Sequence, residues 1–160
     1  MIIGRITLSD RASAGIYEDR SGPEIERILR AHFAGDLVFE TALIPDDREL
    51  IVRKLTEFVD ERGCELVVTT GGTGPMRRDV TPEATREVLA KELPGFGEAM
   101  RMQSFAKVKT SILSRATAGI RGRSLIINLP GNPKAISECL EILLPAILEA
   151  LRHLREDFAA

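Results

Sequence analysis

The chain has 160 residues, of which 44% are hydrophobic and 29% are charged, so it is large and apolar enough to form one domain, residues 1–160, around a core. The formal net charge at pH 7 is −2 without any basic block, which leaves nonspecific nucleic-acid binding without electrostatic support. No apolar run approaches the length of a membrane span, and Arg5 places a charge in the first apolar run, so we expect neither a membrane anchor nor a signal peptide.

The first part of the chain alternates between strand and helix patterns. Residues 2–8 predict a strand, and residues 9–13 predict a polar loop. Apolar residues at helical spacing then predict a helix from Ser21. Residues 37–44 predict a second strand, which the Pro-Asp-Asp turn at residues 45–47 joins to a second helix.

The same alternation continues through the rest of the chain. Residues 65–69 predict a third strand, and Thr81 is expected to cap the helix that follows the glycine-rich loop. The segment 94–97 interrupts the chain before another helical stretch. Residues 124–129 predict a further strand, and a long last helix follows with Asn132 as its cap.

Strands that alternate with amphipathic helices predict an α/β fold, with a mainly parallel sheet covered on both faces. In such sheets, ligands bind at the carboxyl ends of the strands. Four polar or glycine-rich loops are expected at these ends: Ser9–Ser13, Pro45–Asp47, Thr70–Asp79 and Pro130–Asn132. Their convergence predicts a ligand site at one edge of the sheet.

The loop Gly71-Gly72-Thr73-Gly74 permits positive φ and close approach of a ligand, and its successive amides can cradle an anion. It is not a P-loop, because no Gly-Lys-Ser/Thr follows at the required spacing. Nor does it match the dinucleotide pattern, because Arg77 occupies the place of the third glycine. A tight strand-to-helix turn without a ligand is the alternative. Arg78 and Asp79 directly after the loop favour phosphate chemistry.

Two carboxylates, those of Asp46 and Asp79, each follow a predicted strand. Beside a phosphate site they could hold Mg²⁺, a hard cation that prefers oxygen ligands. The alternative is that both are turn or capping residues, although Asp47 could cap its helix and leave Asp46 free. The Pro130–Asn132 loop likewise offers either a ligand-binding helix N-terminus or only a well-capped helix.

The cysteines and histidines carry no metal pattern. Cys64 and Cys139 lack the spacing of a zinc site and are expected to be buried free thiols, as in a reducing cytoplasm. His32 and His153 are isolated in helical stretches. We therefore expect no zinc centre.

Five segments follow one another in a distinctive order: LSDRASAG, TTGGTGPMRRDVTPEAT, PGFGEAMR, SILSRATAG and LIINLPGNPKAISECL. Together they resemble the molybdopterin adenylyltransferase family, which includes MogA and the G domain of gephyrin, over nearly the whole chain. The resemblance implies a three-layer α/β/α sandwich around a mostly parallel sheet, assembled as a homotrimer. It also implies transfer of AMP from Mg-ATP to the terminal phosphate of molybdopterin, which yields adenylyl-molybdopterin and pyrophosphate.

The resemblance also implies roles for single residues. The two essential aspartates of the family match Asp46 and Asp79, which would be catalytic and would hold Mg²⁺. The positions expected to bind molybdopterin or ATP are Ser9, Asp10, Thr70, Gly71, Gly72, Thr73, Gly74, Arg78, Ser114, Arg115, Pro130, Gly131 and Asn132.

Two alternatives share the same fold. One is a MoaB-type molybdopterin-binding protein, and the other is a non-catalytic scaffold. The segments VTPEAT and LPGNP favour the adenylyltransferase branch, and nothing in the chain resembles the long linker or receptor-binding module of a scaffold. A molybdate-inserting enzyme is the partner that the resemblance implies.

Overall fold

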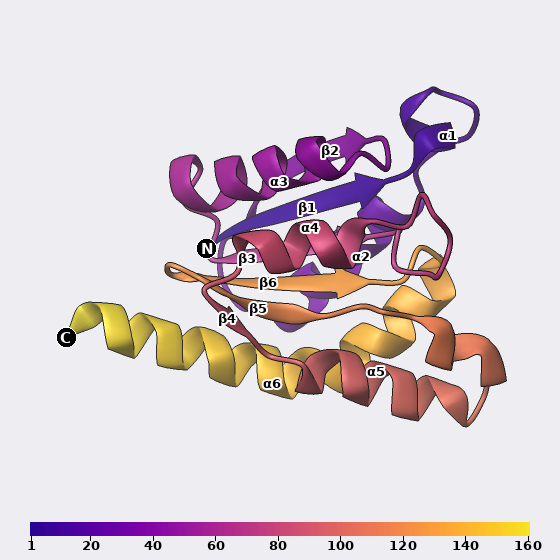
Figure 1. The fold of residues 1–160 in the computed structure, drawn as a ribbon. Helices are drawn as coiled ribbons and strands as arrows, with labels where there is room; N and C mark the ends of the chain where they lie inside the picture. The colour runs from indigo at the N-terminus through magenta and orange to yellow at the C-terminus, as the bar shows by residue number, and fades with distance from the viewer.

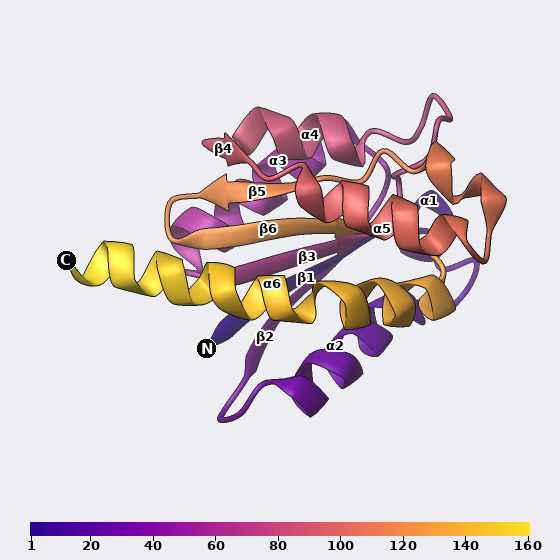
Figure 2. The same cartoon turned by 90° about the horizontal axis from the view of Figure 1, so that it is seen from below.

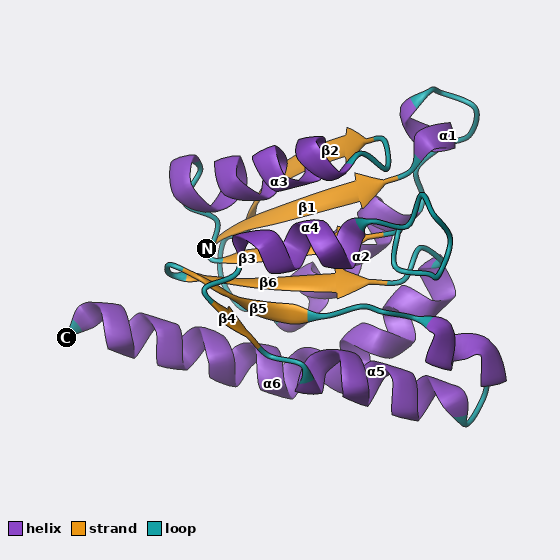
Figure 3. Ribbon diagram, viewed as in Figure 1, coloured by secondary structure: helices purple, strands orange, loops and turns teal.

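Six strands form one sheet in the order β2-β1-β3-β6-β5-β4 in the computed structural model, which describes residues 1–160 (Figures 1 and 3). The strands are β1 Ile2–Leu8, β2 Val38–Ile44, β3 Leu66–Thr70, β4 Lys91–Glu92, β5 Ala118–Arg121 and β6 Ser124–Leu129. Strands β2, β1, β3 and β6 run parallel to one another, whereas β5 is antiparallel to both β6 and β4. The predicted, mainly parallel sheet is confirmed.

Helices cover both faces of the sheet. They are α1 Asp10–Ser13, α2 Ser21–His32, α3 Arg48–Thr56, α4 Thr81–Val88, α5 Gly95–Phe105 and α6 Pro133–Ala159, with a π-helical turn at Glu57–Glu61 and a 3₁₀ turn at Lys109–Leu113. Figure 2 shows α2, α5 and α6 on one face, and α3 and α4 lie on the other. This arrangement confirms the predicted three-layer α/β/α sandwich.

The alternation of side chains along each strand builds two cores. Val68 of β3 belongs to the larger core with Leu29 of α2 and Leu140 of α6. Its neighbour Val67 points to the opposite face and packs in the smaller core with Ile51 of α3. Because successive residues of a strand face opposite sides, a strand that is covered on both faces is buried at every position, as β3 is.

Three local predictions were wrong. The segment 94–97 is not an interruption before a helix, because α5 already begins at Gly95. Residues 9–13 are not a loop, because Ser9 accepts a hydrogen bond from the Ala12 amide at 3.1 Å and so caps the short helix α1. Thr81 does not cap α4, because it lies inside the helix and its hydroxyl donates to the Gly71 carbonyl at 2.9 Å. The capping roles predicted for Asp47 and Asn132 are confirmed by hydrogen bonds of 2.9 Å from the amides of Leu50 and Lys134.

Both cysteines are buried free thiols, as expected. Among the helices, including the 27-residue α6, none has an apolar stretch of the length that crossing a bilayer would need.

Candidate functional site

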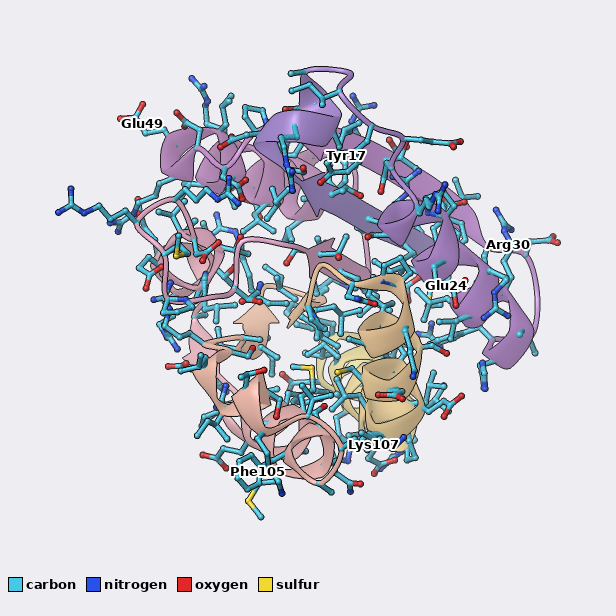
Figure 4. All side chains as sticks on the ribbon, turned by 90° about the vertical axis from the view of Figure 1, so that its right-hand side faces the viewer. Tyr17, Glu24, Arg30, Glu49, Phe105 and Lys107 are labelled. Atoms are coloured by element: carbon cyan, nitrogen blue, oxygen red, sulfur yellow. The ribbon has the colours of Figure 1, made fainter.

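The loops that follow β1, β2, β3 and β6 meet at the carboxyl edge of the sheet and enclose a cleft of about 260 Å³. Figure 4 looks at this end of the molecule, with Tyr17 beside α1. Most of the lining is polar: Thr7, Ser9, Asp10, Arg11, Tyr17, Asp19, Arg20, Ser21, Asp46, Thr70, Gly71, Gly72, Arg78, Asp79 and Gly131, with Leu8 and Ala12. The structure therefore brings together residues from all four loops that the sequence placed at this edge.

The backbone of the glycine loop is left-handed at two positions. Gly71 has φ +98° and Gly72 has φ +64°, values that residues with a Cβ rarely adopt. A Cβ on Gly71 would lie 2.3 Å from the Leu8 carbonyl oxygen, and a Cβ on Gly72 would lie 2.3 Å from the Thr81 hydroxyl oxygen. Both positions require glycine for conformation and for space. Gly74 has no positive φ, in contrast to these two.

Asp79 folds back over the glycine loop. Its Oδ2 accepts a hydrogen bond from the Met76 amide at 2.9 Å, and a Cβ on Gly74 would lie 2.7 Å from the same oxygen. The glycine at position 74 thus leaves room for the carboxylate. Because Asp79 also lines the cleft, its negative charge faces the space in which a ligand would bind.

Asp46 is linked to Asp10 by two reciprocal hydrogen bonds. The Asp46 amide donates to Asp10 Oδ1 at 2.9 Å, and the Asp10 amide donates to Asp46 Oδ2 at 3.2 Å. The other oxygen of Asp46, Oδ1, is buried without a hydrogen-bond partner. Burial is the main cause that raises the pKa of Asp46, and the Asp10 amide and the charge of Arg78 oppose it. A buried, unpaired carboxylate oxygen beside a polar cleft fits the requirement of a divalent cation.

The protein alone supplies few metal ligands. No three His, Cys, Asp or Glu side chains come together as a metal-binding group. Two carboxylates supplemented by substrate phosphates are, however, a usual environment for Mg²⁺. Asp46 and Asp79 fit such a shared site.

The Pro130–Asn132 loop connects the end of β3 to the start of α2. The Thr70 hydroxyl donates to the Pro130 carbonyl at 2.7 Å, and the Ser21 hydroxyl donates to the Gly131 carbonyl at 2.7 Å. Only Gly131 of this loop lines the cleft, and Asn132 serves as the cap of α6.

Ser114 and Arg115 do not line the cleft. Ser114 borders a second hollow of about 200 Å³ between α5, the 3₁₀ turn and α6, which Pro130 also lines. The Arg115 side chain lies behind the glycine loop and donates to the Gly74 carbonyl at 2.8 Å. Thr73 is buried, and its carbonyl accepts from the Arg115 amide at 2.8 Å. Thr73 and Arg115 therefore lie behind the wall of the cleft, and Ser114 belongs to the second hollow.

Sequence reasoning missed the second wall of the cleft, which contains Asp19. Asp19 Oδ2 accepts from the Thr7 hydroxyl at 2.8 Å and from Arg5 Nη1 at 3.1 Å, and Oδ1 accepts from the amides of Ser21 and Gly22. The signal was available, because a helix that follows a parallel strand begins at the edge where the strand ends. The start of α2, after β1, had to lie at this edge.

Comparison with known proteins relates most of the chain to molybdenum-cofactor proteins. A family model described as a probable molybdopterin binding domain matches residues 4–150. A molybdopterin adenylyltransferase from Helicobacter pylori strain J99 is 57% identical over 145 residues, which are 91% of this chain and 82% of that protein. The molybdopterin adenylyltransferase of Escherichia coli K12 is 52% identical over 139 residues, or 87% of this chain and 71% of that protein.

Solved structures give the same relationship. The molybdopterin biosynthesis enzyme MoaB from Thermus thermophilus superposes with a TM-score of 0.86 at 40% identity, covering 96% of this chain and 95% of that one. A structure of MogA superposes with a TM-score of 0.88 at 35% identity, covering 96% of this chain and 99% of that one.

Proposed function

The chain belongs to the family of probable molybdopterin-binding domains, and from this premise we propose that it is a molybdopterin adenylyltransferase. An oxygen of the terminal phosphate of molybdopterin would form a bond to the α-phosphorus of ATP. The bond from that phosphorus to the β-phosphate oxygen would break, and pyrophosphate would leave. The observation that supports this chemistry best is the cleft in which Asp46, Asp79 and the left-handed Gly71-Gly72 backbone meet.

The cleft suits a reaction between two anions. A phosphate monoester is already a nucleophile at neutral pH, so the protein needs to align it and offset negative charge rather than remove a proton. Three arginines, Arg11, Arg20 and Arg78, line the cleft and supply positive charge. Mg²⁺ held between Asp46, Asp79 and the phosphates of ATP would supply further charge stabilisation when bound.

The second hollow offers a place for the other substrate. It is separated from the cleft by the Pro130-Gly131 turn, since Pro130 lines one space and Gly131 lines the other. Its wall includes Met100, Val108 and Cys139, which suit a flat heterocycle better than a phosphate chain. We therefore place the pterin ring in the hollow beside Ser114 and its phosphate toward the glycine loop.

The decisive experiment is turnover. Purified protein incubated with molybdopterin and Mg-ATP should release one pyrophosphate for each adenylyl-molybdopterin formed. Omission of molybdopterin is the matched control, because plain hydrolysis of ATP would persist without it. A folded protein that binds both substrates and releases no pyrophosphate would contradict the enzymatic proposal.

A second candidate is a binding protein that does not transfer AMP. The close superposition on the MoaB structure motivates it. Such a protein would retain molybdopterin in equilibrium dialysis and form no adenylylated product in the same experiment. Product analysis by mass spectrometry therefore separates the two candidates directly.

Further proposals concern the assembly and surroundings of the chain. We propose that residues 1–160 act as one domain within a homotrimer, which analytical ultracentrifugation would test by the mass of the particle.

The two buried free thiols support a reducing compartment such as the cytoplasm. The product is a phosphoric anhydride, so the enzyme that uses it is proposed to insert molybdate and release AMP.

A further inference from the structure

Asp79 lies on a segment that has little structure of its own. Between β3 and α4, residues 73–79 belong to no helix or strand, and Met76 at their tip is 64% exposed. Within this segment, the Asp79 amide donates to the Met76 carbonyl at 3.0 Å, and the Asp79 side chain accepts from the Met76 amide. Short local bonds of this kind do not fix the segment relative to the rest of the protein.

One residue from a distant part of the chain connects this segment to the body of the protein. The amide of Arg115 donates to the Thr73 carbonyl at 2.8 Å, its Nε donates to the Gly74 carbonyl at 2.8 Å, and its Nη2 donates to the Asp79 carbonyl at 2.6 Å. Arg115 thus holds the segment at both of its ends. Because these acceptors are backbone carbonyls, the contacts fix the path of the chain rather than one side chain.

Glu83 in the first turn of α4 orients the guanidinium group. Its two carboxylate oxygens accept from Nη1 and Nη2 of Arg115. All three guanidinium nitrogens therefore have protein acceptors, in the planar geometry that a carboxylate and an arginine share. Neither Arg115 nor Glu83 lines the cleft. Four of the five guanidinium N–H groups are engaged within the protein, which leaves a single N–H of Nη1 for any other partner.

We infer that Arg115 and Glu83 form a positioning pair that holds residues 73–79 against α4 and so keeps the Asp79 carboxylate at the cleft. The role of Asp79 in transfer rests on the proposed function, whereas the restraint on the loop does not. A lysine at position 115 cannot replace the pair, because one ammonium group cannot reach two carbonyls and a carboxylate in this fork geometry.

The restraint can be measured without any turnover. The segment contains the exposed pair Arg77-Arg78, which trypsin cleaves when the loop opens. In Arg115→Lys and in Glu83→Gln, cleavage between these arginines should be at least about tenfold faster under native conditions, as for a local opening made more frequent. The matched control is Arg86→Gln, which removes an exposed ion pair with Glu92 from the same helix α4 and should cleave at the wild-type rate. Wild-type cleavage rates in both positioning variants would overturn the inference.

Kinetics provide the second readout. Both variants should lower kcat by roughly tenfold and change the KM for ATP less than threefold, and the double variant should be no worse than either single one, because the pair acts as a unit. If Arg115 instead binds phosphate, Glu83→Gln frees its guanidinium, and turnover in that variant should be retained. That outcome would refute the inference that Arg115 and Glu83 act together to position the loop. A wild-type protein without turnover would refute the proposed function alone, because the proteolysis still tests the restraint.

Discussion

The loops after β3 and β6 both join a buried strand to a helix at the same edge of the sheet, yet they make different contributions to the site. The loop after β3 has two left-handed glycines and directs the Asp79 side chain toward the cleft. The loop after β6 has no positive φ, and its carbonyls accept hydrogen bonds from Thr70 and Ser21. One loop presents chemical groups to the cleft, and the other binds the end of β3 and the start of α2.

The difference has a geometric origin. A Cβ on Gly72 would overlap Thr81 and Asp46, whereas the nearest atom to a Cβ on Gly131 is the Gly71 Cα at an ordinary 3.6 Å. Glycine is therefore required by the backbone in the first loop. In the second loop, the space would accept a methyl group. A glycine before a helix indicates a ligand site only when its conformation or its surroundings exclude a side chain.

The largest expected effect tests whether the carboxylates of Asp46 and Asp79 act in the reaction. Asp79→Asn and Asp46→Asn nearly preserve size and remove one anionic oxygen, so transfer should fall on the order of 10²-fold while molybdopterin affinity changes little. Pyrophosphate release and equilibrium dialysis measure the two quantities. Asp47→Asn is the control, since asparagine caps the helix as well as aspartate does. Wild-type turnover in Asp79→Asn would exclude the role assigned to that carboxylate.

The next effect compares the stability of two variants, each of which adds one methyl group to one of the two loops. Gly72→Ala should destabilise the fold by about 2 kcal/mol or more, because the left-handed backbone and the overlap both oppose a Cβ. This corresponds to a fall in Tm of at least about 4 °C for a chain of this size. Gly131→Ala should leave Tm within about 1 °C. Equal melting temperatures in the two variants would remove the geometric distinction between the loops.

Much of the fold that carries these two loops could be predicted from the sequence. The strand-helix alternation, the parallel edge and the caps at Asp47 and Asn132 follow from local patterns, and the structure has all of them. Strands β4 and β5 were missed because they are only two and four residues long and pair antiparallel, outside the alternation. Gly122, with φ +53° in the hairpin between β5 and β6, was the available signal for that reversal.

The site was less predictable than the fold. The sequence placed Asp46, Asp79 and the glycine loop at one edge, and the cleft contains all three. What it could not show is which way a side chain points. Arg115 and Thr73 lie in motifs that resemble ligand-binding segments, but the Arg115 side chain binds the Gly74 carbonyl and Thr73 is buried. Orientation of this kind depends on residues far apart in sequence, such as Arg115 and Glu83.

A smaller effect concerns the cost of keeping Asp46 in place. Burial raises the pKa of Asp46 above its ordinary value of 3.8, so the folded state binds a proton more readily than the unfolded state does. The stability that this group contributes is present below the ordinary pKa and is lost as the pH rises through the raised one. Asp46→Asn should therefore melt slightly higher than wild type at pH 7, and the difference should shrink as the pH approaches 4. The variant would therefore be more stable than the wild type and less active.

Thermal melts at several pH values, with Asp47→Asn as the control, measure this effect. Asp47 lies next to Asp46 and is exposed, so its replacement removes the same charge from the loop without relieving burial. A difference between Asp46→Asn and wild type that is constant with pH, or of the opposite sign, would show that burial of the carboxylate carries no cost.

The smallest effect is spectroscopic and separates the cleft from the second hollow. Tyr17 is the only tyrosine and the chain has no tryptophan, so its fluorescence reports one place in the protein. Its hydroxyl lies 2.8 Å from the Ser9 hydroxyl, and the Arg11 guanidinium lies 5.3 Å from its ring centroid. Magnesium tripolyphosphate, which does not absorb where tyrosine does, should attract Arg11 and change the tyrosine emission with a saturable dose dependence. Tyr17→Phe should bind the same ligand in a calorimeter and give no signal. Calorimetric binding to the wild type without any change in emission would place the phosphate chain outside the cleft, and the Ser114 hollow would then be the site to test.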